Sequence, residues 1–158
     1  MSRWTYPLGA IENTEEDEDM DTAKIRSTAT QSITASTPTA VTMTTTEFQK
    51  GTGITAGSSS ITVVAAGYYR IEWGGSWAQA ATAAGATLSP KVNGAALFLT
   101  LPTSMLSQDL RTDSSVVAGN SATHLLAAGA VITLEALHTD SSAKNLTASL
   151  CVTKVASV

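Results

Sequence analysis

Residues 61–73 read ITVVAAGYYRIEW, and a close echo, THLLAAGAVITLE, recurs at residues 123–135. Each copy holds two aliphatic residues, then Ala-Ala-Gly, then an alternating run that reaches a glutamate. Alternation of apolar and polar residues with a period of two is typical of a half-buried β-strand. Glycine supplies backbone freedom that alanine lacks, so Ala-Ala-Gly predicts a corner before a strand. The likeness fades outside these stretches, and we interpret them as two corners of one β-fold instead of an internal repeat.

Alternation gives each of these runs two faces. In the first run Tyr69, Ile71 and Trp73 share one face. The same pattern continues in AVITLEAL at residues 130–137 and in NLTASLCV at residues 145–152. One face of each strand in a sandwich packs against the opposite sheet. The residues expected to be buried are Tyr69, Ile71, Trp73, Ile132, Leu134, Leu146 and Leu150.

Helical periodicity is nearly absent, and alternating runs separated by Gly, Asn and Ser recur along the chain. They predict about ten short strands, at residues 31–36, 39–49, 60–65, 68–78, 86–92, 95–101, 115–119, 122–126, 130–138 and 145–155. Turn signals occur at Gly51-Thr52-Gly53, Gly57-Ser58-Ser59, Gly67, Gly74-Gly75, Asn93-Gly94, Gly119-Asn120, Gly129 and Asp140-Ser141-Ser142. Asn93-Gly94 is the strongest, because a type I′ hairpin needs two positive φ angles. We expect a loop at residues 108–115, and either a loop or one helical turn at residues 78–86.

The composition is typical of one β-rich globular domain. The 158 residues are 43% hydrophobic and only 14% charged. The single cysteine, Cys151, excludes an internal disulfide framework. No apolar run approaches the ~18 residues that a membrane span requires. The N-terminus lacks the basic flank and apolar centre of a signal peptide, so we expect synthesis in a cytoplasm and no contact with a membrane.

Charge is distributed unevenly along the chain. Residues 1–23 hold seven acids against Arg3, whereas the remaining residues hold eight bases against six acids. We therefore predict an extended acidic N-terminal arm over residues 1–30, followed by a β-domain over residues 31–158. Apolar groups near the tip of the arm precede the acid run, which predicts docking on a partner that carries basic groups. The arm residues expected to bind are Trp4, Tyr6, Pro7, Leu8, Ile11, Glu15, Glu16, Asp17, Glu18 and Asp19.

No motif for catalysis is complete. Gly74-Gly75-Ser76 resembles part of a nucleophile elbow, but no helix pattern follows it as that elbow requires. His124 and His138 lack the spacing of metal ligands, and Cys151 lies within an alternating run. We therefore expect neither enzyme activity nor a cofactor. The bases are scattered and the overall charge is −4, which disfavours nucleic-acid binding.

Two other patterns have a functional and a structural interpretation. Asp17, Asp19 and Asp21 reproduce the first ligand positions of a calcium loop, but the sharp-turn glycine and the bidentate glutamate of that loop are missing. An acid run that faces solvent or a partner is the preferred interpretation. Trp73 and Trp77 are candidates for a carbohydrate platform. With aromatics at 5% of the chain, core packing is preferred for Trp73, and Trp77 is left open.

The order of the motifs resembles the jelly roll shared by tumour necrosis factor and the complement globular head. Gly67-Tyr68-Tyr69 opens the first long strand, residues 126–132 form the later Leu-x-x-Gly corner, and residues 145–155 make the closing strand. Ala130 stands where that family usually has an acid. The resemblance covers about residues 30–157. It implies an all-β jelly-roll sandwich and a homotrimer, formed about a threefold axis through the sheet that holds the first and last long strands.

Alternation, combined with the geometry that the resemblance implies, gives a set of trimer-interface residues. They are Tyr68, Arg70, Thr147, Ser149 and Cys151. Alternation alone does not say which face points inward. The function expected from these features is that of a structural protein of a virus particle: a trimeric capsid decoration, or cement, protein of a tailed phage. It would lie on the outer capsid surface and bind the major capsid protein or neighbouring trimers through its arm. The alternative is a head-fibre or tail-fibre tip that binds host surface glycans; a secreted cytokine-like ligand is disfavoured by the missing signal sequence.

Overall fold

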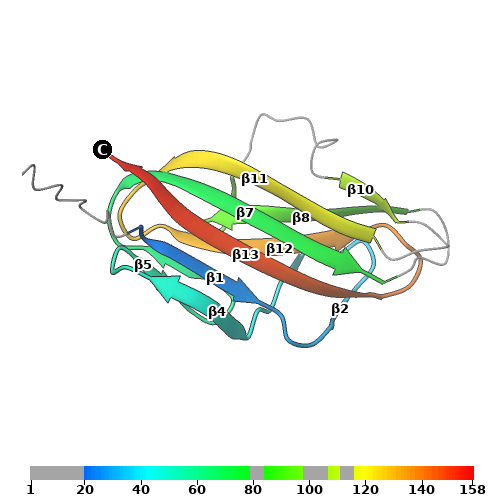
Figure 1. Ribbon diagram of the computed structural model, residues 1–158. Coiled ribbons are helices and arrows are strands. Elements are labelled where there is room, and N and C mark those ends of the chain that lie inside the picture. The colour runs from blue at the N-terminus through cyan, green and yellow to red at the C-terminus, as the bar shows by residue number, and fades with distance from the viewer. Residues whose placement is uncertain (1–19, 79–83, 98–106, 111–115) are drawn as a thin grey trace, which may run out of the picture.

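The computed structural model describes residues 20–78, 84–97, 107–110 and 116–158, and it gives only the backbone at residue 84 and at 107–110 and 116–119. In these ranges the chain forms strands and connecting turns, without a helix. The strands make two antiparallel sheets that pack face to face (Figure 1). The predicted all-β jelly-roll sandwich is confirmed.

Sheet A has two long strands side by side at its centre. Its order is β11 (Val116–Leu126), β7 (Gly67–Trp77), β13 (Lys144–Ser157), β1 (Thr22–Arg26) and β4 (Thr45–Lys50), with β2 (Gln31–Ile33) also paired to β13. β7 and β13 pair along almost their whole lengths, from Gly67 opposite Ser157 to Trp77 opposite Leu146. The first and last long strands therefore lie side by side at the centre of one sheet, as the resemblance implied.

Sheet B covers the inner face of sheet A. Its order is β10 (Ser107–Leu110), β8 (Ala84–Val92), β12 (Val131–His138), β6 (Ile61–Val63) and β5 (Ile54–Ala56), with β3 (Thr39–Ala40) paired to β12 and β9 (Ala95–Ala96) paired to β8. The turn between β8 and β9 has φ of 51° at Asn93 and 79° at Gly94. Two positive φ angles are what the Asn-Gly signal predicted.

The two echoed corners lie beside each other in space. The backbone N–H of Gly129 donates to the carbonyl of Val63 at 2.8 Å, and the N–H of Val63 donates to the carbonyl of Ala130 at 3.0 Å. Gly129 has φ of +80°, a left-handed conformation that favours glycine. Gly67 is not among the glycines with positive φ. It is needed for another reason, since a Cβ there would lie 2.7 Å from the carbonyl oxygen of Ala156. The prediction that the two stretches are corners of one fold is confirmed.

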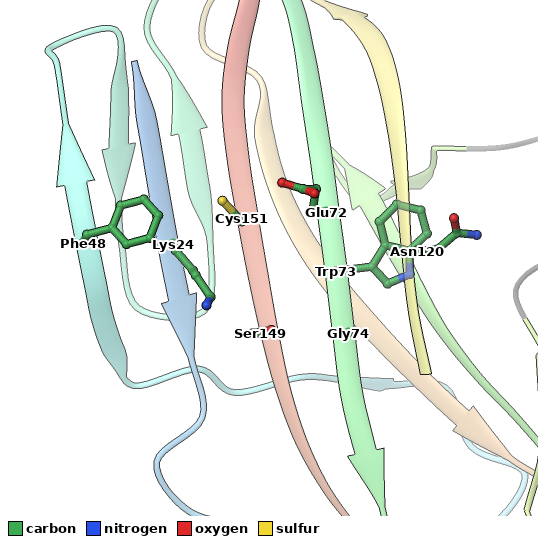
Figure 2. Close-up of a pocket in the computed structure, with 8 residues that line it drawn as sticks. All are labelled: Lys24, Phe48, Glu72, Trp73, Gly74, Asn120, Ser149 and Cys151. Atoms are coloured by element: carbon green, nitrogen blue, oxygen red, sulfur yellow. The ribbon is translucent and has the colours of Figure 1, made fainter. Parts of the chain in front are cut away.

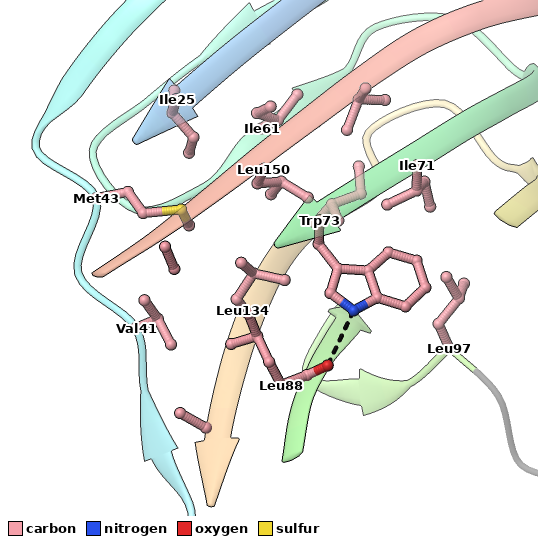
Figure 3. Close-up of a cluster of buried hydrophobic side chains, with 14 of the residues drawn as sticks. Ile25, Val41, Met43, Ile61, Ile71, Trp73, Leu88, Leu97, Leu134 and Leu150 are labelled. Carbon is pink, nitrogen blue, oxygen red and sulfur yellow. Dashed lines mark hydrogen bonds between the residues drawn. The ribbon is translucent and has the colours of Figure 1, made fainter. Parts of the chain in front are cut away.

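The seven residues expected to be buried all lie in the core. Tyr69, Ile71, Ile132, Leu146 and Leu150 are fully buried, while Leu134 and Trp73 are 1% and 6% exposed. The indole Nε1 of Trp73 donates to the carbonyl of Leu88 at 2.9 Å, a bond that joins sheet A to sheet B (Figure 3). Trp77 is only 1% exposed. Both tryptophans are therefore core residues, and the carbohydrate platform considered for them is wrong.

β1 corrects the predicted boundary of the arm. The sequence TAKIR at residues 22–26 lies within the range assigned to the arm, yet it forms a strand paired to β13 on one side and β4 on the other. Ala23 and Ile25 are fully buried, and they are the only two apolar residues in this strand. That is too short a pattern to separate from the polar sequence around it. The sheet begins at Thr22, and residues 1–19 of the predicted arm lie outside the described residues.

Other strand boundaries also differ from the prediction. Residues 115–119 and 122–126 were expected as two strands with a turn at Gly119-Asn120, but they belong to the one strand β11, which pairs with β7 without a break. Gly74-Gly75 lies inside β7, not at a turn. Gly119 in β11 and Gly74-Gly75 in β7 therefore lie within paired strands, and the chain does not reverse at them.

Short strands account for the remaining differences. The expected strand at residues 39–49 is divided between β3 and β4, and β5 had not been expected. β10 pairs with β8 in a segment that was expected to be mostly loop, and its sequence has no alternating pattern that predicts this pairing. β9 covers only the start of residues 95–101. Residues 79–83, 98–106 and 111–115 lie outside the described residues, so the expectations at those positions stay predictions.

Candidate interaction surface

The outer face of sheet A carries the residues predicted for the trimer interface. Tyr68 is 45% exposed and Arg70 is exposed, while Thr147, Ser149 and Cys151 are half-buried. Their strand neighbours Tyr69, Ile71, Leu146, Leu150 and Val152 point into the core. The structure therefore settles the direction that alternation left open, and it places all five predicted interface residues on the side of sheet A away from sheet B. Their contact with another copy stays a prediction.

One row of side chains crosses the five strands of this face. Ser121 of β11 lies opposite Glu72 of β7, Glu72 opposite Cys151 of β13, Cys151 opposite Lys24 of β1, and Lys24 opposite Phe48 of β4. Directly opposite side chains on neighbouring strands are close enough to interact. The row therefore combines a hydroxyl, a carboxylate, a thiol, an ammonium group and an aromatic ring on one surface.

An open depression of about 480 Å³ lies over the middle of this face (Figure 2). Gly74 and Ser149 lie directly opposite each other and are small, so the surface is hollow there. The residues that line the depression are Lys24, Phe48, Glu72, Trp73, Gly74, Asn120, Ser149 and Cys151. Two of the residues predicted for the trimer interface, Ser149 and Cys151, therefore lie in its wall. Lys24, Phe48 and Glu72 are part of the same surface and had not been predicted.

Charges on this face are paired within the sheet. The Nζ of Lys24 lies 3.1 Å from a carboxylate oxygen of Glu47, which also lies 3.8 Å from the Nε of Arg26. The guanidinium of Arg70 lies 2.8 Å from the carboxylate of Glu72. These pairs are partly exposed, and each contributes only about 0–1 kcal/mol to stability. Their main consequence is a face without strong net charge.

The candidate catalytic motifs do not form an active site. Ser76 continues the paired strand β7 and lies opposite Thr147, so the strand-to-helix turn of a nucleophile elbow is absent at this position. His124 lies opposite Tyr69 and not beside Cys151. Within the described ranges, no three or more His, Cys, Asp and Glu side chains gather as a metal site would require. No helix in those ranges could cross a membrane.

Asp21 has a structural role that the sequence did not reveal. Its Oδ1 accepts a hydrogen bond from the backbone N–H of Gly53 at 2.7 Å, and its backbone carbonyl accepts one from Lys154 at 2.8 Å. A Cβ at Gly51 or at Gly53 would collide with the Asp21 carboxylate. The Asp21 carboxylate therefore packs against the turn formed by Gly51-Thr52-Gly53. Asp17 and Asp19, the other two acids of the calcium-like pattern, lie outside the described residues.

A second group of polar side chains is buried at the opposite end of the sandwich, where β13 begins. His138 is fully buried, and its Nε2 lies 2.8 Å from the carbonyl oxygen of Ile33, to which it donates a hydrogen bond. Lys144 and Asp140 form an ion pair of 3.5 Å in which both side chains are at least nine-tenths buried. Oδ1 of Asp140 also accepts the backbone N–H of Ser142 at 3.1 Å. This group closes the turn between β12 and β13, as the Asp-Ser-Ser signal indicated.

Tyr69 lies in the core and interacts both with the first Ala-Ala-Gly corner and with the carboxylate of Asp21. Its hydroxyl donates to the carbonyl of Ala65 at 2.8 Å, in the first Ala-Ala-Gly corner. Burial, and to a smaller degree the Asp21 carboxylate, raises the pKa of Tyr69 above its ordinary value of 10.0. Both effects disfavour the phenolate, so the protonated donor is the form that the fold stabilises.

Comparison with solved structures bears on the fold. No protein-family model matches the sequence, and no curated protein matches it significantly. Murine APRIL at pH 5.0 is 16% identical, with a TM-score of 0.59 over 86% of this chain and 99% of that one. Murine APRIL at pH 8.5 is 15% identical, with a TM-score of 0.56 over the same shares. The globular domain of zebrafish complement 1qA protein is 14% identical, with a TM-score of 0.57 over 87% of this chain and 98% of that one. At such identities the likeness shows the fold alone, a jelly roll of the tumour necrosis factor and complement globular head kind.

Proposed function

We propose that this chain is a non-catalytic structural protein: a homotrimer that decorates the outer capsid surface of a tailed phage and stabilises the shell through its N-terminal arm. The observation that carries the proposal is the outer face of sheet A. It extends over five strands, holds all five predicted interface residues, and is covered by no other described part of the chain. A jelly-roll fold hosts many functions, so the proposal rests on this face and on the arm.

The chemistry of the face suits contact with further copies. Gly74, Ser76, Thr147 and Ser149 lie on its two central strands, and such short side chains allow another backbone to come close. Glu72 is already paired with Arg70 and Glu47 with Lys24, so closing the interface would bury few unpaired charges, which are the costly ones. The resemblance implies a threefold axis at this sheet, and a symmetric assembly would bring the same surface of three copies together.

The arm supports the decoration role. Its tip is apolar, with Trp4, Tyr6 and Leu8, and Glu12 to Asp19 follow as a nearly continuous acid run. Apolar anchors supply binding energy when buried on a partner, and charge steers and orients the contact. The expected partner is the major capsid protein or a neighbouring trimer with basic groups on its surface. Binding to the folded form alone would stabilise the assembled state.

Fractionation of native particles tests this function. A decoration protein should be present in large stoichiometric excess on capsid shells. A few copies at a tail end would instead support the fibre-tip alternative, and absence from particles would refute both. The fibre-tip alternative is weakened, because Trp73 and Trp77, which were the candidates for a carbohydrate platform, lie in the core. Sedimentation of the purified chain tests the trimer, which a stable monomer at micromolar concentration would contradict.

A further inference from the structure

Most of the exposed large apolar side chains that the structure describes gather at one end of the sandwich, which we name the apolar end. They are Met20, Val64, Tyr68, Leu125, Val155 and Val158, with exposures between 45% and 73%. Phe48, on the outer face of sheet A, is the other such residue in the described ranges. The apolar end is where β13 finishes and the chain terminates (Figure 1).

Pairing and hydrogen bonds fix these residues at the same end. Leu125 lies opposite Tyr68, and Tyr68 lies opposite Ala156, next to Val155. The backbone N–H of Val64 donates to the carbonyl of Gly53 at 2.8 Å. The N–H of Gly53 in turn holds the carboxylate of Asp21, the residue after Met20. The first Ala-Ala-Gly corner, the second corner and both ends of the described chain thus meet here.

A cluster of this kind indicates contact with another surface. Single exposed apolar residues are ordinary, whereas several at one place mark a binding site. The alanines of both corners, Ala65, Ala66, Ala127 and Ala128, are exposed at the same end and add small apolar groups. An isolated domain gains nothing by exposing Val64 and Val155 to water.

Two lysines border the apolar end. Lys50 lies opposite Thr22, the first residue of β1, and the backbone of Lys154 is hydrogen-bonded to Asp21. The other described lysines and arginines, Lys24, Arg26, Arg70, Lys91 and Lys144, are in ion pairs, whereas within the described ranges neither Lys50 nor Lys154 is. The apolar end therefore offers apolar surface bordered by two lysines outside the ion pairs of the described residues, beside the Asp21 carboxylate.

The arm has the complementary sequence. It joins the domain at Met20, and its apolar tip is separated from that point by an acid run. An extended segment from Ile11 to Met20 spans about 30 Å, since each residue adds about 3.3 Å. A sheet of five strands is only about 20 Å wide, with strands about 4.8 Å apart. The repulsion between the acids favours an extended run, which would carry the tip beyond its own apolar end.

We infer that the apolar end is the docking site for the apolar tip, residues 4–11, of a neighbouring copy, with Lys50 and Lys154 facing the acid run of that arm. The inference rests on the proposed function and deepens it, because it identifies the partner of the arm as a second copy. Such a contact joins two different surfaces and links copies in series, unlike the symmetric contact at sheet A, with which the apolar end shares Tyr68.

A complementation experiment with full-length chains tests the docking. The tip variant is Trp4→Ser with Tyr6→Ser, and the end variant is Val64→Glu with Val155→Glu; neither pair changes the five predicted trimer-interface residues. The control, Ser32→Glu with Thr34→Glu, adds the same charge at exposed positions near the opposite end. Thermal melting shows that each variant is folded, and sedimentation gives the size of the particles.

The wild type and the control should form particles larger than the trimer, and each of the other variants alone should stop at the trimer. A mixture of the tip variant and the end variant should regain association, because each supplies the surface that the other lacks. A mixture that stays at the trimer while the wild type associates would overturn the inference, since the tip would then bind its own end or another surface. Wild-type chains that never exceed the trimer would also overturn it, without touching the trimer itself. A monomeric wild type would refute the trimer, and the mixture of the tip and end variants would still test the docking.

A labelled peptide of residues 1–19 gives a second measurement. It should bind the tip variant, whose apolar end is free, about tenfold or more tightly than it binds the end variant, a ratio that corresponds to about 1.4 kcal/mol. The charge control at Ser32 and Thr34 should not weaken the binding of the peptide. Equal binding to the tip and end variants would contradict the docking site.

Discussion

The carboxylate of Asp21 accepts a hydrogen bond from the backbone N–H of Gly53, with 2.7 Å between Oδ1 and N. This contact joins the first residues of the domain to the turn between β4 and β5. Replacing Asp21 by Ala should lower the free energy of unfolding by about 1–2 kcal/mol, because hydrogen bonds to charged groups contribute more than neutral ones. Urea denaturation measures the change.

A double-mutant cycle separates this contact from general effects of substitution. Gly53→Ala should destabilise the wild type, since its Cβ would collide with the Asp21 carboxylate. The same substitution should cost less when Asp21 is already Ala, because the collision is then absent. Costs that simply add would show that the two residues are not coupled.

The core register gives a second prediction. Leu134 is 1% exposed, and Leu134→Ala should lower the free energy of unfolding by about 2–5 kcal/mol through lost burial and the cavity left behind. Thr133 precedes it on the outer side of β12 and is half-buried, so Thr133→Ala is the matched control and should cost much less. Similar losses at both positions would be inconsistent with this register.

The glycines of the two corners should respond differently to substitution. Gly129 has φ of +80°, and the space that a Cβ would occupy there has no neighbouring atom within 4 Å, so Gly129→Ala should cost roughly 1 kcal/mol from backbone strain alone. Asn tolerates positive φ, and Gly129→Asn should therefore recover much of that loss. At Gly67 the obstacle is the carbonyl of Ala156, so Ala and Asn should both be destabilising. Melting temperatures of the four variants distinguish strain from collision.

Alkaline pH should weaken the fold through Tyr69. Its pKa is raised by burial and by Asp21, so between the unfolded and folded pKa values the folded state binds more protons than the unfolded state. The contribution of this group is fully present below pH 10.0, the ordinary pKa, and is lost as pH rises through the raised pKa. Tyr69→Phe should flatten the alkaline loss of melting temperature, which thermal melting between neutral and alkaline pH measures.

Long alternating runs made the fold predictable, and short or backbone-determined features did not. β7, β12 and β13 have enough alternating positions for both the strand and its buried face to follow from sequence. β1 has only Ala23 and Ile25, and β10 pairs through backbone groups that any residue possesses. Gly119-Asn120 carries a turn signal, but pairing with β7 along the whole strand outweighs local preference.

The interaction surface was likewise predictable only in part. Tyr68, Arg70, Thr147, Ser149 and Cys151 follow from alternation on two strands that the sequence shows clearly. Lys24 and Phe48 belong to the same face only because β1 and β4 extend sheet A beyond β13, a long-range pairing without a local signal. The apolar end depends on where several separate segments finish, and the exposed residues there are scattered from Met20 to Val158 in the sequence.

The acid run of the arm gives the last prediction. Changing Glu15, Glu16, Asp17, Glu18 and Asp19 to their amides should weaken the attachment of the trimer to particles, and chiefly at low salt. Exposed charges interact over a Debye length of about 10 Å at 0.1 M salt, and higher salt screens them, so wild type and variant should converge as salt is raised.

Deleting residues 1–11 removes the apolar tip and should behave differently. The deletion should leave a folded trimer, since the sheet begins at Thr22, but attachment should be weak at every salt concentration because the apolar anchors are gone. Co-sedimentation of the purified variants with stripped particles over a range of salt measures both effects. A shortened chain that binds particles as tightly as the full one would mean that the arm is a solvated tail. A salt-independent loss from the amide variant would mean that the acids make close contacts instead of steering the approach.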